Sequence, residues 1–261
     1  MDNLDVLGMS KAVAPEKSMK ELTLPRFGVI TAAIHQIANS LTKKASEIRS
    51  CVVSMISKAQ SGHIGGCFSA ADLLTVLYYY KMRLDLNNPK WADRDRFILS
   101  KGHSAPLLYA ILIDLGFLDT NELATLREVD SRLEGHPHSL RTPGIDMSSG
   151  SLGMGLSAGC GMALAAKLDN KQYKTYVLLG DGELQEGQNW EAVMAAAHFH
   201  LDNLVAIVDK NNLQTDAPVK TVMNCGNLAD QFKAFGWNVV EIDGHNIKEI
   251  IHALDLAELS N

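Results

Sequence analysis

Four short runs of mostly apolar residues constrain the fold of this chain more than any other feature of its sequence. They cover residues 96–100, 176–179, 204–208 and 237–242, and they are continuous rather than alternating. Strands with this pattern are covered on both faces, as in the parallel sheets of α/β proteins. Helical stretches lie between them, including residues 155–168 and 189–200. The sequence therefore predicts an α/β fold with a doubly wound, mostly parallel sheet and helices on both faces.

The first 38 residues have only weak periodicity, and we interpret residues 1–38 as an N-terminal extension. From residue 41 to residue 59, apolar side chains recur every three or four positions, which is typical of a helix with one buried face. Residues 39–261 are expected to form one domain. Within it, glycines and prolines interrupt residues 131–150, and a long irregular segment inside a compact domain is usually functional or mobile.

Composition argues against several classes of function. The formal net charge of −6 disfavours a general surface for nucleic acid or anionic membranes. The longest apolar runs fall far short of the ~20 residues that a membrane helix needs, and the first 25 residues contain no signal-peptide run. The four cysteines are far apart in sequence, which is typical of reduced thiols. We expect a cytoplasmic protein with no nucleic-acid and no membrane partner.

Polar or glycine-rich residues follow three of the predicted strands. The first strand leads into Lys101-Gly102-His103, the second into Gly180-Asp181-Gly182-Glu183, and the third into Asp209-Lys210-Asn211-Asn212. Ligands of open parallel sheets bind beyond the carboxyl ends of the strands. These three segments are therefore expected to meet in one crevice.

Asp181 and Asn211, thirty positions apart (211 − 181), indicate a metal site in that crevice. Asp181 supplies a hard anionic oxygen and Asn211 a hard neutral one, which suits Mg²⁺ or, as a substitute, Ca²⁺. Gly180 and Gly182 allow a tight turn and bring backbone amides close to a phosphate. A Gly-Asp-Gly sequence alone is a common turn, but the strand before it and the second strand ending in Asn-Asn favour a site for a diphosphate with its metal.

These segments resemble the thiamine diphosphate fingerprint, and residues 180–187 are similar to transketolases in particular. Four further segments agree with that family, namely residues 61–63, 100–103, 135–137 and 150–153. The motifs follow the family's order over about residues 40–261, which resembles only the first third of a full-length transketolase. Split transketolases encode this diphosphate-binding domain as a separate chain, so the chain is identified as an N-terminal subunit of that kind.

The resemblance implies roles for individual residues. The metal ligands would be the side chains of Asp181 and Asn211 and the backbone carbonyl of Leu213. Residues that bind the cofactor would be His103, Gly150, Ser151, Leu152, Gly180, Asp181, Gly182, Glu183 and Asn211. The catalytic residues around the sugar would be His63, His103 and His136. Glu186 and Glu191 match acidic residues near the family's subunit interface.

The histidines divide into two groups by their surroundings in the sequence. His63, His103 and His136 lie in glycine-rich or strand-end loops, where polar sites assemble, and neutral imidazoles suit sugar hydroxyls near pH 7. We interpret four other histidines as exposed or merely hydrogen-bonded side chains. They are His198, His200, His245 and His252.

The chain departs from the family's pattern at Ile64, Ser151 and Thr215, which leaves the sugar specificity open. In the family, one more strand follows the final helix, so the domain over residues 39–261 is expected to lack its last strand.

The resemblance implies a transketolase-type transferase that uses thiamine diphosphate and Mg²⁺. It would move a two-carbon ketol unit from a ketose or ketose phosphate to an aldose or aldose phosphate. In the family the next domain holds the pyrimidine ring of the cofactor. The expected partner is therefore a C-terminal, pyrimidine-binding subunit in an α2β2 assembly, and the chain alone is expected to be inactive.

Two alternatives stay open. One is a subunit of another thiamine diphosphate enzyme, of the 2-oxo-acid dehydrogenase alpha or deoxyxylulose phosphate synthase type. Residues 100–103 and 135–137 favour the transketolase type. The other alternative is a non-catalytic phosphate-binding module.

Overall fold

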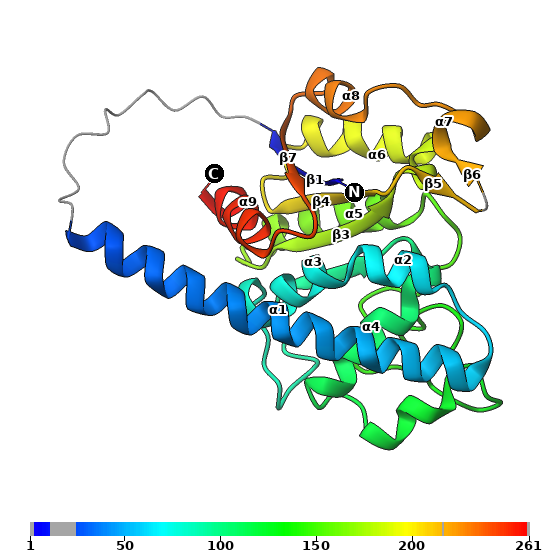
Figure 1. The fold of residues 1–261 in the computed structure, drawn as a ribbon. Coiled ribbons are helices and arrows are strands. Elements are labelled where there is room, and N and C mark those ends of the chain that lie inside the picture. Colours follow the sequence, from blue (N-terminus) through cyan, green and yellow to red (C-terminus); the bar gives the residue numbers. More distant parts are fainter. Residues whose placement is uncertain (1–2, 11–24, 216, 260–261) are drawn as a thin grey trace.

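The computed structural model describes residues 3–10, 25–215 and 217–259. A five-stranded sheet in the order β2-β3-β4-β1-β7 forms its centre, with helices on both faces (Figure 1). The four predicted strands are present as β2 (Arg96–Leu99), β3 (Thr175–Gly180), β4 (Leu204–Lys210) and β7 (Trp237–Asp243). β2, β3 and β4 pair in parallel. The prediction of a doubly wound, mostly parallel sheet is confirmed.

Strand β1 (Asn3–Ser10) is a feature that the sequence pattern did not predict. It lies between β4 and β7 and pairs antiparallel with both. Its eight residues include Asn, Asp, Gly and Ser, which have low strand propensity, so the segment carries no clear strand pattern. The first long helix also begins earlier than expected, at Pro25. The division of the chain at residue 38 stays a prediction.

Each face of the sheet has its own hydrophobic core. One core lies under α1 (Pro25–Ala59), α3 (Ala71–Val76), α4 (Ala105–Asp114) and α9 (Ile247–Leu259). The other lies under α5 (Gly155–Leu168), α6 (Gly187–His198) and α8 (Leu228–Ala234). Alternate residues of β3 enter opposite cores, Leu178 the first and Val177 the second. This double burial explains why the strands are continuously apolar.

The helix patterns in the sequence agree well with these elements. The stripe predicted from residue 41 to residue 59 lies in α1, where Leu41, Ile48, Val52 and Met55 are buried. The stretch predicted over 155–168 is α5. The shorter elements are α2 (Ile64–Ser69), α7 (Val219–Val222), a π-helical turn (Leu77–Lys81), three 3₁₀ turns (Gly102–Ser104, Thr120–Thr125, Gly182–Gln185) and a two-stranded ribbon, β5 (Leu213–Gln214) with β6 (Ala217–Pro218).

Residues 131–150 contain no helix or strand, as the sequence predicted, yet side chains hold the segment in place. The hydroxyl of Tyr109, on the buried helix α4, donates to the backbone carbonyls of Glu134 and His136, both at 3.0 Å. Thr142 donates to the carbonyl of Arg132 at 2.7 Å. The irregular segment is therefore anchored beside the carboxyl end of the sheet.

Candidate active site

The carboxyl ends of β3 and β4 and the residues just beyond β2 open into a cavity of about 310 Å³. Its lining includes most of the predicted site residues, namely His63, His103, Leu152, residues 180–183, Asn211 and Leu213. Lys101, Gln214 and Thr215 also line it. Of the predicted residues, His136, Gly150 and Ser151 are not part of this lining. The expected meeting of three strand ends in one crevice is thus present in the fold.

Asp181 lies at the end of β3 with both carboxylate oxygens oriented by backbone amides. Oδ1 accepts a hydrogen bond from the amide of Gly182 at 2.9 Å, and Oδ2 accepts one from the amide of Asn212 at 2.7 Å. The residue is only 4% exposed. Burial raises the pKa of this carboxyl, and the two amide donors oppose that rise. The carboxylate is therefore fixed in direction and has lost much of its solvation.

The loop after β4 presents Asn211 and Leu213 to the same cavity. The Asn211 side-chain oxygen accepts a hydrogen bond from the amide of Leu213 at 2.9 Å, which fixes the turn. Asn212 and Thr215 adopt left-handed backbone conformations, with φ of 59° and 53°. Such conformations are costly for residues other than glycine and are concentrated at functional sites.

These oxygens fit a small divalent cation that shares its shell with a phosphate. No cluster of three or more His, Cys, Asp or Glu side chains that could hold a metal occurs in the described part of the chain. Mg²⁺ needs no such cluster, since it is usually bound through one or two carboxylates, waters and substrate phosphates. A Cβ atom at Gly182 would lie only 3.2 Å from the side chain of Gln214, so a glycine keeps this turn open. The donor set fits Mg²⁺ with a diphosphate.

Glu183 lines the cavity, but its carboxylate is already used by the protein. Oε1 accepts hydrogen bonds from the hydroxyl of Ser100 and from the amide of Gly153 (2.9 Å), and Oε2 accepts one from the amide of Gly180 (3.0 Å). The residue is 3% exposed. Burial raises the pKa of the carboxyl, while these hydrogen bonds lower it. Its predicted role in cofactor binding stays a prediction, and the geometry links its side chain to three loops.

A buried ion pair at the cavity is a feature that the sequence analysis missed. Lys101 Nζ lies 2.5 Å from Asp209 Oδ2 and also donates to the carbonyl of Gly66 at 3.2 Å. Asp209 Oδ1 accepts from the hydroxyl of Ser69 at 2.6 Å. The four residues connect the ends of β2 and β4 with α2. The only sequence signal was that Lys101 and Asp209 both follow buried strand residues, where an isolated charge is costly unless it is paired.

His63 and His103 face each other at the cavity, with ring centroids 5.4 Å apart in an edge-to-face arrangement. Burial is the main cause that lowers the pKa of His103 to about 4, and the positive charge of Lys101 contributes. The imidazole is therefore neutral near pH 7 and can donate one hydrogen bond and accept another.

His136 lies outside this lining but beside the glycine-rich turn after β2. A Cβ atom at Gly102 would come within 2.7 Å of Ser149 Oγ, 3.1 Å of the Gly150 amide and 3.2 Å of the His136 ring. Gly102 thus allows His136 and the end of the irregular segment to approach the turn that carries His103. Burial, followed by the charge of Arg127, lowers the pKa of His136.

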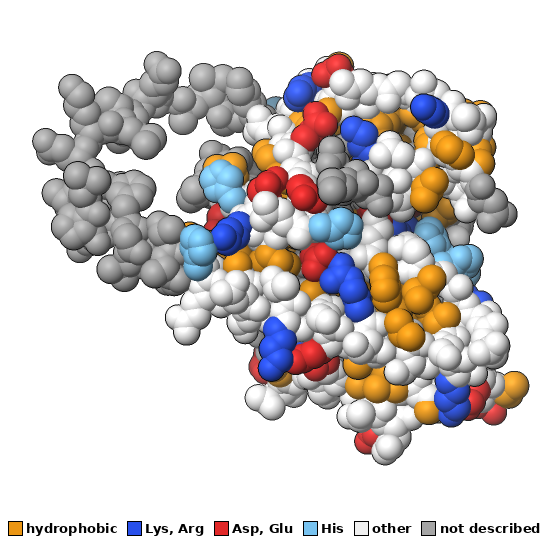
Figure 2. Space-filling model, viewed as in Figure 1, with side chains coloured by type: hydrophobic (Ala, Val, Ile, Leu, Met, Phe, Trp, Pro, Cys, Tyr) orange, Lys and Arg blue, Asp and Glu red, His pale blue; other side chains and the backbone are white. Residues whose placement is uncertain are grey.

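Two exposed leucines belong to the lining of the cavity. Leu152 and Leu213 line it and are exposed, Leu213 by 61%. Ile64 follows His63 and is also exposed. Figure 2 shows hydrophobic side chains gathered over α2, close to histidines on the same face. Patches of this kind beside a polar site are typical of surfaces that bind other molecules.

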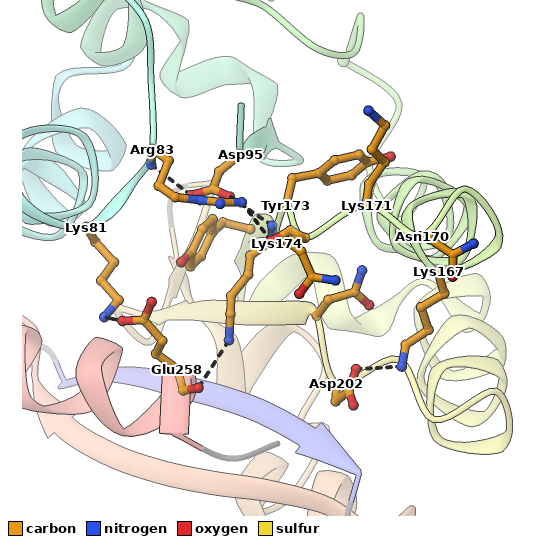
Figure 3. A pocket seen from close by; sticks show the side chains of 13 residues that line it. Lys81, Arg83, Asp95, Lys167, Asn170, Lys171, Tyr173, Lys174, Asp202 and Glu258 are labelled. Atoms are coloured by element: carbon orange, nitrogen blue, oxygen red, sulfur yellow. Dashed lines mark hydrogen bonds and ion pairs between the residues drawn. The ribbon is translucent and has the colours of Figure 1, made fainter. Parts of the chain in front are cut away.

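A second cavity, of about 660 Å³, lies at the opposite end of the sheet (Figure 3). Its lysines and arginine are balanced by carboxylates or by helix carbonyls. Arg83 pairs with Asp95, Lys167 pairs with Asp202, and Lys174 donates to backbone carbonyls at the end of α9. The cavity is larger than the first, but these charged side chains already have partners within the protein, and we do not assign it a ligand.

Comparison with known proteins identifies the family of this chain. The family described as transketolase, thiamine diphosphate binding domain, matches residues 40–261. An apulose-4-phosphate transketolase subunit of Phocaeicola vulgatus is 44% identical over 222 residues, which are 85% of this chain and 79% of that protein. A 6-deoxy-6-sulfo-D-fructose transketolase subunit of a Clostridium species is 43% identical, over 84% of this chain and 79% of that protein.

Full-length transketolases are similar over the same region. Human transketolase is 41% identical over 85% of this chain, which spans 36% of the human protein. The structure of transketolase from Leishmania mexicana superposes with a TM-score of 0.78 at 30% identity, covering 85% of this chain and 35% of that one. The chain belongs to the transketolase family and carries its thiamine diphosphate-binding domain. None of the helices in the described residues is both long and apolar enough to cross a membrane.

Proposed function

We propose that this chain is the diphosphate- and Mg²⁺-anchoring subunit of a two-chain transketolase. The observation that carries the proposal is the convergence of Asp181, Asn211 and Leu213 on a glycine-rich cavity that also holds His63 and His103. The reaction would move a two-carbon ketol unit from a ketose to an aldose. When bound, thiamine diphosphate supplies the nucleophilic carbon and the electron sink that breaking the carbon–carbon bond requires.

The residues at the ends of β3 and β4 would hold the metal and the diphosphate. Asp181 and Asn211 would offer side-chain oxygens to Mg²⁺, and Leu213 would offer its backbone carbonyl. Gly182 and His103 would face the diphosphate, and the neutral ring of His103 would donate to a phosphate oxygen. Gly180 would permit the turn, and Gly150, Ser151 and Leu152 would line the thiamine. The buried, oriented carboxylate of Asp181 supports this assignment.

The three histidines would hold the sugar. His103 is neutral at physiological pH because its environment opposes protonation, so it can exchange hydrogen bonds with hydroxyl groups or with an oxygen that gains charge. His63 lies against it, and His136 lies beside Gly102 and Gly150. Two histidines in the cavity lining and a third beside the adjoining glycines support a role in orienting substrate and moving protons.

A second chain would complete the site. In the family a carboxylic acid hydrogen-bonds the aminopyrimidine ring of the cofactor. The two carboxylates in the cavity lining, Asp181 and Glu183, already accept hydrogen bonds from this chain, so that carboxylic acid would come from the second chain. The exposed apolar rim formed by Leu152 and Leu213 would suit a covering partner. The two similar proteins are themselves named as transketolase subunits. We propose a pyrimidine-binding C-terminal subunit in an α2β2 assembly.

The substrates would be sugars or sugar phosphates. The similar subunits act, by their names, on apulose 4-phosphate and on a sulfonated fructose, so phosphorylated, sulfonated and branched ketoses are the first donors to try. The four cysteines are free, which supports a cytoplasmic location.

Two assays test the proposal and separate it from its rivals. The chain with Mg²⁺ should bind thiamine diphosphate in preference to nucleotides; the reverse preference would indicate a different phosphate-binding module. Mixed with its partner subunit, it should transfer ketol units from a pentulose phosphate and not act on pyruvate. Turnover at enzymatic rates by this chain free of any second polypeptide would contradict the two-chain proposal.

A further inference from the structure

The three hydrogen bonds of Glu183 join three segments that are far apart in the sequence. Its donors are Ser100 at the end of β2, Gly153 after the thiamine-lining loop, and Gly180 at the end of β3. Each donor lies within three residues of a proposed cofactor contact. Ser100 precedes His103, Gly153 follows Leu152, and Gly180 precedes Asp181.

Packing around Gly153 leaves that loop few other positions. Its φ of 85° is a left-handed value that favours glycine, and a Cβ atom there would lie 2.6 Å from Glu186 Cβ. Ser100 is equally constrained, because its hydroxyl accepts a hydrogen bond from the amide of Gly155 at 3.2 Å while it donates to Glu183. The Glu183 carboxylate thus completes a hydrogen-bond network in which the Ser100 hydroxyl and the amides of Gly153, Gly155 and Gly180 all have partners.

We infer that Glu183 is a positioning residue that does not itself contact the cofactor. Its carboxylate holds the thiamine-lining loop, residues 150–153, in a fixed position relative to the diphosphate loop, residues 180–183. The inference rests on the proposed function, since it concerns the same cavity. Its physical basis is the number of donors. Two backbone amides and one hydroxyl converge on a carboxylate that is only 3% exposed. An ionised carboxylate and the phosphates of the cofactor are both hydrogen-bond acceptors, so they have no hydrogen bond to exchange.

Glutamine at this position cannot reproduce the network. If its oxygen keeps Ser100 and Gly153, its NH₂ group faces the amide of Gly180, and two donors then oppose each other. If the amide is turned, the NH₂ group faces the amide of Gly153 instead. A buried donor without an acceptor favours displacement of the loop that carries it, so Glu183→Gln should separate the two loops.

Asp95 offers a matched control at the other end of the sheet. It is 2% exposed and also accepts two backbone amides, from Arg83 and Lys174, both at 2.8 Å, together with a side-chain donor, Arg83. Asp95→Asn therefore makes the same chemical change in a comparable network, but far from the cofactor cavity. Any loss of cofactor affinity that reflects only a less stable fold should appear in both variants.

The experiment measures thiamine diphosphate binding with saturating Mg²⁺ by calorimetry, and the melting temperature without ligands, for the full chain and its variants. Both variants should lower the melting temperature. Glu183→Gln should weaken binding about tenfold, or about 1.4 kcal/mol, whereas Asp95→Asn should change it less than about twofold. Ser100→Ala, which removes one donor of three, should weaken binding by a smaller factor and carries the test if Glu183→Gln does not fold.

The outcomes are distinct. Equal affinity losses in the Glu183 and Asp95 variants, or no loss in Glu183→Gln and Ser100→Ala, would overturn the positioning role. A parent chain that binds no thiamine diphosphate, either alone or together with its partner subunit, would instead contradict the proposed function on which the inference rests.

Discussion

The two ends of the sheet both carry a cavity, but they use charged groups differently. At the amino end, residues just before β2, β3 and β4 line about 660 Å³ with lysines, an arginine and carboxylates that pair with one another (Figure 3). At the carboxyl end, about 310 Å³ is lined by glycines, histidines and side-chain oxygens. There the carboxylates accept hydrogen bonds from backbone amides or a hydroxyl group. The one lysine of the lining, Lys101, is paired with Asp209.

The difference shows that cavity size does not identify the functional site. At the amino end the charged side chains pair with groups of the protein, so their electrostatic attraction for a ligand is weak. Oriented oxygens and amides at the carboxyl end have no cationic partner in the described lining other than Lys101, which Asp209 neutralises. A metal with an anionic ligand is therefore better accommodated there. Variants at the two ends test this contrast.

The largest effect is expected from the metal ligands. Asp181→Ala or Asn211→Ala should weaken Mg²⁺-dependent thiamine diphosphate binding by at least about 100-fold, or about 2.8 kcal/mol, because each removes a hard oxygen from a small octahedral shell. Calorimetry with and without Mg²⁺ measures it. Asp202→Ala at the amino end is the control and should bind like the parent; parent-like binding by either ligand variant would refute the metal assignment.

Removal of a sugar-facing histidine should affect turnover more than cofactor binding. In the two-chain enzyme, His136→Ala should lower kcat/KM by an amount equivalent to roughly 2–4 kcal/mol, with cofactor affinity little changed, since the residue lies outside the cavity lining. His198→Ala, at the last residue of α6, should leave both parameters unchanged. Weakened cofactor binding in His136→Ala, with normal turnover once the cofactor is saturating, would contradict the sugar-facing position of His136.

The lowered pKa of His103 predicts a pH effect on stability. An unfolded histidine titrates near ~6.5, whereas His103 in the fold has a pKa of about 4. Between these values the unfolded chain takes up a proton that the folded chain does not. The free energy of unfolding should therefore be highest above about pH 6.5 and fall as the pH drops toward about 4. Urea titrations of the ligand-free chain at several pH values should show a shallower fall for His103→Gln. An unchanged slope would count against a neutral, half-buried His103.

The smallest effect is expected from a partly exposed ion pair at the amino end. Lys167 Nζ lies 2.6 Å from Asp202, with the side chains 35% and 39% exposed. Lys167→Met should change the free energy of unfolding by no more than ~1 kcal/mol and should not alter cofactor affinity. A marked loss of affinity would show that the two ends of the sheet are coupled.

The sequence by itself determined the fold class and the approximate site. Continuous apolar runs between helical stretches are typical of strands covered on both faces, and strands β2, β3, β4 and β7 lie where those runs occur. Because parallel strands end at the same edge, the residues after them had to meet, and His103, Asp181 and Asn211 do share one cavity. These inferences depend on local pattern and chain direction, which a sequence contains.

Only the tertiary structure decided which groups are free to act. Glu183 is adjacent to the metal loop in sequence, but its carboxylate is occupied by donors from three segments. Lys101 looked like one more polar residue at a strand end, until Asp209, 108 positions later, proved to be its partner. Strand β1 joined the sheet without a strand pattern of its own. Hydrogen bonds and burial between distant segments have no local sequence signature, because they depend on how the completed fold brings those segments together.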